Sequence, residues 1–83
     1  MPLHLLATFE WSNDDVIFVT SLAEELRVFG HLDHQSRPQQ DDTTTHEMKL
    51  RASPATAGRV LDLFAGVAEA GALVTLEMHT EEK

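Results

Sequence analysis

Two features of the sequence predict an α+β sandwich, in which two helices cover one face of a four-stranded antiparallel sheet. Apolar residues recur at every second position in four segments, as half-buried strands require. Two further segments carry apolar residues at every third or fourth position, as amphipathic helices require. Along the 83 residues the order is strand, helix, strand, strand, helix, strand.

The first strand is predicted over residues 3–10, where Leu, Leu, Ala and Phe alternate with more polar residues. The first helix is predicted over residues 13–29, after a cap at Ser12 that has Asp15 three residues on, in capping-box spacing. Its inward stripe is Val16, Val19, Leu22, Ala23, Leu26 and Phe29.

Both ends of this helix carry further local signals. Trp11 and Val16 have the spacing of a hydrophobic staple, in which an apolar residue before the cap packs on one in the next turn. Gly30 is predicted to end the helix in the left-handed conformation that glycine adopts without strain.

The middle of the chain is predicted to form two strands, residues 31–36 and 43–52, joined by a polar turn that contains Pro38. The threonines at the start of the second segment favour a strand. Ser53 followed by Pro54 is a typical helix start, because proline suits the first helical position.

The second helix carries Ala57, Val60, Leu61, Phe64, Val67 and Ala68 on its inward stripe. Gly58 and Gly66 interrupt it, and we expect each to allow a close approach of another backbone. Gly71 is predicted to end the helix. The last strand is predicted over residues 72–80.

This order is that of the ferredoxin-like sandwich. Right-handed crossovers in both strand–helix–strand halves give the spatial strand order 4-1-3-2, with both helices on one face. The whole chain, residues 1–83, is predicted to be one domain with a disordered tail from about residue 80.

Composition excludes several functions. With no cysteine, the chain has no disulfide, no thiolate metal site and no cysteine nucleophile. Its formal net charge is −8 and its few Lys and Arg residues are scattered, which argues against nucleic-acid binding. No segment approaches the roughly 18 apolar residues of a membrane-spanning helix. We therefore predict a cytoplasmic protein with no nucleic-acid or membrane partner.

Association is the first functional hypothesis: a non-enzymatic protein that works as a homo-oligomer or as an accessory subunit of another protein. Ile17 and Val28 lie close together on the helical wheel, away from the core stripe. Leu63, at the edge of the second helix's stripe, could extend this patch. Leu73, on a predicted edge strand, is a further candidate because unpaired strand edges invite a second chain.

The second hypothesis is a small-molecule or transition-metal sensor that uses the open face of the sheet. In the predicted strand order, His4 and His79 become cross-strand neighbours with Glu77 on a diagonal, a ligand set that suits zinc, nickel or copper. Arg51 is expected nearby and would oppose a cation. The alternative is a solvated polar face with cross-strand ion pairs. No other cofactor is predicted.

A third hypothesis is a small enzyme that uses carboxylates of the open face. Glu10, Glu47 and Glu77 are the candidates, and the sequence offers no geometry that ranks them. No serine has a recognisable His and Asp partner, so we assign no catalytic residue.

Overall fold

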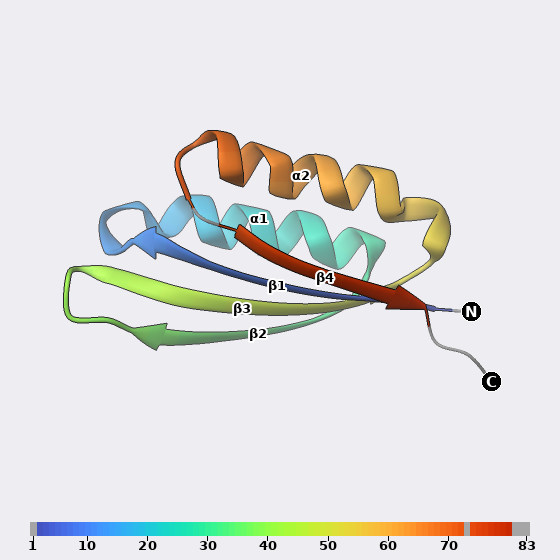
Figure 1. The fold of residues 1–83 in the computed structure, drawn as a ribbon, viewed down its shortest axis with the longest axis horizontal. Helices are drawn as coiled ribbons and strands as arrows, with labels where there is room; N and C mark the ends of the chain where they lie inside the picture. The colour runs from blue at the N-terminus through green and yellow to red at the C-terminus, as the bar shows by residue number, and fades with distance from the viewer. Residues whose placement is uncertain (1, 73, 81–83) are drawn as a thin grey trace.

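The strands and helices follow the predicted order (Figure 1). The computed structural model describes residues 2–72 and 74–80. The strands are β1 (Leu3–Ser12), β2 (Gly30–Pro38), β3 (Thr43–Ala52) and β4 (Val74–Thr80). The helices are α1 (Val16–Phe29) and α2 (Ala57–Glu69), which follow the short 3₁₀ turns η1 (Asn13–Asp15) and η2 (Pro54–Thr56).

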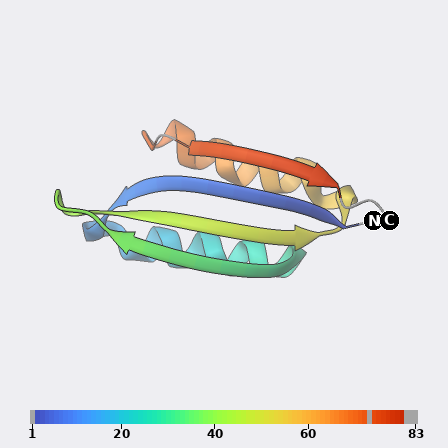
Figure 2. The same ribbon diagram turned by 60° about the horizontal axis from the view of Figure 1, so that its bottom comes forward.

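The sheet has the strand order β2-β3-β1-β4, and every neighbouring pair is antiparallel. Read from the other edge, this is the predicted order 4-1-3-2. Both helices lie on one face of the sheet and leave the other face open (Figures 1 and 2). The predicted ferredoxin-like α+β sandwich is confirmed.

The core fills the space between the sheet and the helices because the strands alternate as predicted. On the central strand β1, the side chains of Leu3, Leu5, Ala7 and Phe9 are all buried. Phe9 meets Phe64 of α2 edge to face, with 6.5 Å between ring centroids. Complete burial of such side chains stabilises a fold by about 1.5–3 kcal/mol each, which anchors α2 on β1.

Serine side chains cap both helical segments at their predicted starts. The Ser12 hydroxyl accepts a hydrogen bond from the Asp14 backbone N–H at 3.1 Å, and the Ser53 hydroxyl accepts one from the Ala55 N–H at 3.3 Å. The Ser12 bond differs from that of a capping box, in which the hydroxyl would accept from the N–H of Asp15, three residues on, rather than from that of Asp14. Asp15 itself precedes α1 and makes no side-chain cap of that helix.

The predicted staple between Trp11 and Val16 is wrong. Trp11 stacks instead on Phe18, with ring centroids 4.3 Å apart and an interplanar angle of 15°. Val16 is left 62% exposed. A flat aromatic partner two residues further along the helix offers the indole more contact area than valine does.

The glycines behave differently from the prediction at three positions. Gly30 is extended rather than left-handed, and its role is a close approach: a Cβ there would lie 2.1 Å from the Arg51 carbonyl oxygen. Gly58 and Gly66 were expected to make such approaches, but a Cβ at either would meet nothing within 4 Å. Gly71 ends α2 with a φ of 107°, as predicted.

The edge strand β4 is less well covered than the other three strands. Leu76 and Met78 pair with Ala7 and Leu5 of β1, so they lie on the helix side of the sheet, yet each is 38% exposed. Within the described residues, no helix is long and apolar enough to cross a membrane.

Candidate functional site

The open face of the sheet carries a transverse row of basic side chains that spans all four strands. Because side chains on a strand alternate between faces, residues that are paired across strands point the same way. His31 pairs with Arg51, Arg51 with His4, and His4 with His79. We call these four residues, one from each strand, the basic row: His31, Arg51, His4 and His79.

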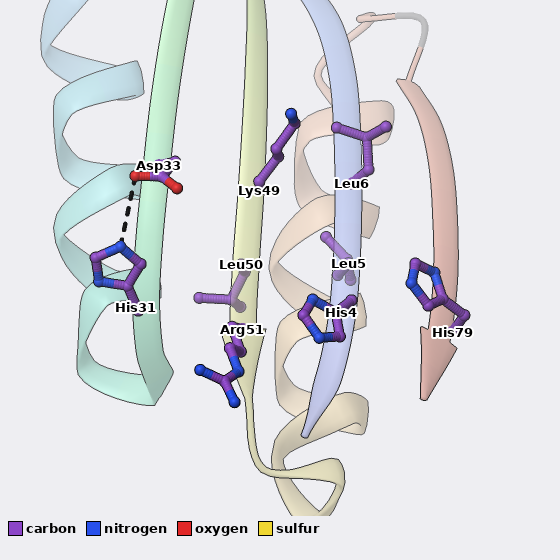
Figure 3. Close-up of a pocket in the computed structure, with 9 residues that line it drawn as sticks. All are labelled: His4, Leu5, Leu6, His31, Asp33, Lys49, Leu50, Arg51 and His79. Atoms are coloured by element: carbon purple, nitrogen blue, oxygen red, sulfur yellow. Dashed lines mark ion pairs between the residues drawn. The ribbon is translucent and has the colours of Figure 1, made fainter. Parts of the chain in front are cut away.

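A hollow of about 320 Å³ lies over the basic row (Figure 3). Its lining also includes Asp33, Lys49 and Leu6, which occupy the next row of the open face on β2, β3 and β1. Ligand pockets in proteins are typically concave and about 300–1,000 Å³ in volume, so this hollow suits a small molecule.

The imidazoles of the basic row have defined geometry. The His4 and His79 rings stack almost in parallel, with centroids 5.3 Å apart and an interplanar angle of 10°. Nε2 of His31 lies 3.5 Å from the Asp33 carboxylate, as the dashed line in Figure 3 marks. His4 and Arg51 each have further interactions in the structure.

The charge around the hollow contrasts with that of the whole chain. Among the described residues, the lining holds two cationic side chains, Arg51 and Lys49, and one carboxylate, that of Asp33. Three histidines add positive charge whenever they are protonated. The chain as a whole has a formal charge of −8, so the hollow is a locally basic region of an acidic protein.

The strand register places the three residues predicted as metal ligands in the predicted relation, with Glu77 on a diagonal from His4. His4 and His79 are direct cross-strand partners, as the sequence suggested. Glu77 lies one row further along, opposite Leu6. Across residues 2–72 and 74–80, no three histidine, cysteine or acidic side chains group tightly enough to hold a metal ion.

The four residues predicted for association fall in different places. Ile17 and Val28 are 79% and 81% exposed on α1. Val28 and Leu63 line one groove between the two helices, which also contains Glu25, Arg59 and Asp62, whereas Ile17 is outside that groove. Leu73 lies outside the described residues.

The carboxylates considered for acid–base chemistry lie in three separate rows of the open face. Glu10 pairs with Thr45, Glu47 with Thr8, and Glu77 with Leu6. The Glu47 carboxylate approaches the Lys49 ammonium at 4.0 Å on its own strand. No two of the three are therefore direct cross-strand partners.

A second histidine pair, which was not predicted from the sequence, lies on the other side of the sheet. Nε2 of His34 is 2.9 Å from Nδ1 of His46, and His46 also packs on Phe9 with 5.4 Å between ring centroids. Burial lowers the pKa of both histidines. The signal was available in the β2–β3 pairing, where His34 lies diagonally across from His46.

Comparison with known proteins supports the fold and supplies no function. No family model and no curated protein matches the sequence. Among solved structures, the de novo designed protein Foldit4 is similar at a TM-score of 0.77 and 9% identity, over 99% of this chain and 100% of that chain. A DUF3240 family protein from Shewanella baltica is similar at a TM-score of 0.57 and 12% identity, over 96% of this chain and 91% of that one.

Proposed function

We propose that this chain is a non-enzymatic binding protein that takes up a small molecule on the open face of its sheet. The observation that carries the proposal is the hollow over the basic row, to which all four strands contribute a side chain. Strands hold side chains more precisely than loops do, so this face is suited to a defined ligand.

Binding fits the described residues better than catalysis does. Glu10, Glu47 and Glu77 lie in separate rows, so none has a second carboxylate opposite it on the neighbouring strand. General acid–base catalysis needs a group within hydrogen-bond reach of the reacting atom, commonly with a partner that tunes it. A cytoplasmic location forms part of the proposal, since the absence of cysteine suits a reducing compartment.

Amide chemical-shift mapping with a library of small molecules of mixed charge tests this proposal. Compounds that bind are expected to shift the amides of the basic row and of its neighbours Asp33 and Lys49. A library whose hits all fall on α1 and α2, or which yields no hit, would contradict the proposal.

A second candidate function is self-association through the helix layer, with a second copy of this chain as the partner. Val28 is 81% exposed, and its groove holds Arg59 together with the carboxylates of Glu25 and Asp62. Two copies related by a twofold axis could therefore pair Arg59 of each with a carboxylate of the other around an apolar centre.

Light scattering after size-exclusion chromatography tests this second candidate. The mass is expected to rise from monomer towards dimer with concentration, and Val28→Asp is expected to abolish that rise. Thr20→Asp, which adds the same charge at another exposed position of α1, is the matched control and should still dimerise. If the natural chain has the mass of a monomer at all concentrations, self-association is refuted.

A further inference from the structure

We propose that the group bound over the basic row is an anion, a carboxylate or phosphate carried by a small organic molecule. This inference rests on the proposed binding function and names the chemical class of its ligand. Three observations support an anion: the basic side chains of the row, the residues of the neighbouring row, and the acidity of the chain as a whole.

The charge of the basic row favours an anion over a cation. Arg51 lies between two histidines in the row, because it pairs with His31 on one side and His4 on the other. Guanidinium groups bind carboxylate and phosphate through two parallel hydrogen bonds, and imidazoles add donors to an anion when protonated. A metal cation at the same place would meet the Arg51 charge.

The next row of the open face indicates an organic ligand rather than a bare ion. Leu6 is half-buried at its centre and lines the hollow together with Lys49. Asp33 and Glu77 flank this row on the outer strands β2 and β4. An apolar part of a ligand can lie over Leu6, while the two carboxylates direct its anionic end back to the basic row.

The electrostatic field over the basic row comes from the strands of the open face. The charged groups that face the three histidines of the row are Asp33 on β2, Lys49 and Arg51 on β3, and Glu77 on β4. Both helices lie on the other face of the sheet. Among the described groups, these strand residues are therefore the ones that set the field that an anion meets over the basic row.

Titration of the ¹⁵N-labelled full chain with three probes tests the inference. Benzoate and inorganic phosphate represent the two anionic classes, and benzamide is the neutral counterpart of benzoate. We expect at least one anion to shift the amides of the basic row, and benzamide to bind roughly tenfold or more weakly than benzoate if the carboxylate class is correct. A response to phosphate alone assigns the phosphate class.

Two arginine variants locate the anion on the face. Arg51→Gln is expected to weaken binding of the anion roughly tenfold or more. Arg37→Gln removes the same charge from the same face, but Arg37 pairs with Thr45, three rows away from His31 along β2, so the change in affinity should stay below about twofold. If Arg51→Gln does not fold, the double variant His31→Gln/His79→Gln takes its place, and it too is expected to weaken binding of the anion roughly tenfold or more.

The outcomes separate the inference from the function on which it rests. Equal shifts of the basic row with benzoate and benzamide, and none with phosphate, would overturn the anion assignment and leave a binding face for neutral molecules. Equal weakening by Arg51→Gln and Arg37→Gln would also overturn it, because that result indicates attraction without a site. If no compound of any charge shifts this face, both the inference and the proposed function fail.

Discussion

The Nε2 atom of His34 lies 2.9 Å from the Nδ1 atom of His46, on the helix side of the sheet and away from the basic row. One imidazole must donate and the other must accept in this contact. The pair can therefore carry at most one proton more than its neutral form without losing the hydrogen bond.

The pair is expected to make the stability of the fold depend on pH. Burial lowers the pKa of His34, with the Arg27 guanidinium of α1 adding to the effect. Burial likewise lowers the pKa of His46, with His34 adding to it. In the unfolded chain both histidines have the ordinary pKa of 6.5. In mildly acidic solution the unfolded chain therefore binds more protons at these two imidazoles than the folded chain does.

The free energy of unfolding is therefore expected to be at its full value above pH 6.5 and to fall as the pH drops from there through the lowered pKa values of the folded state. Urea unfolding at a series of pH values measures this. The double variant His34→Gln/His46→Gln should flatten the dependence, whereas Ser36→Ala, which keeps both imidazoles, should retain it. An equal slope in all three chains would refute this account of the pair.

Replacing Gly30 by alanine is expected to destabilise the fold by about 1–3 kcal/mol or more. The added methyl group would lie 2.1 Å from the Arg51 carbonyl oxygen, and backbone on both strands would have to move apart. Chemical denaturation measures the loss. A variant as stable as the natural chain would show that β2 and β3 are less closely apposed at this point.

Replacing Gly66 by alanine is expected to stabilise the fold by about 1 kcal/mol, because alanine is the better helix former. Gly66 is exposed on α2, and a Cβ there meets nothing within 4 Å. This is the opposite sign from Gly30→Ala, so the two variants form a matched pair in one denaturation experiment. A loss of stability at Gly66 would point to a contact that the single chain does not contain.

Removing the Ser12 hydroxyl is expected to cost about 1 kcal/mol, the usual value for a lost helix cap. The Ser12 hydroxyl oxygen accepts a hydrogen bond from the Asp14 N–H, and without it this N–H would lack a partner at the start of the helical segment. Ser12→Ala measures the loss by thermal or chemical unfolding. Ser12→Asp restores an acceptor and should recover most of the difference; equal stability of all three chains would rule out a role for the cap.

The sequence was sufficient to predict the element order and sheet topology because each local signal agreed with the others. Alternation predicted the strands and apolar stripes predicted the helices, and the structure contains these elements in that order. Ser12 and Ser53 cap the helical segments that they were predicted to start. A chain with this order and two right-handed crossovers has few other ways to bury all its apolar faces together.

Features that depend on the register between strands were harder to predict. The place of His31 in line with Arg51, His4 and His79 depends on the β2–β3 pairing, which local patterns do not determine. His34 and His46 lie on different strands, so the alternation within either strand does not reveal their diagonal contact. Gly30 was misread because a left-handed turn and a close backbone approach both require glycine.

Relaxation enhancement by a pair of soluble gadolinium chelates, one anionic and one neutral, tests the central claim most directly, because it compares the field over the basic row with that over the rest of the surface. With a formal charge of −8, most of the surface should repel the anionic chelate and respond more strongly to the neutral one. Our account predicts that the anionic chelate enhances relaxation more than the neutral one does at the amides of His31, Arg51, His4 and His79. A weaker response of these four amides to the anionic chelate than to the neutral one would contradict it.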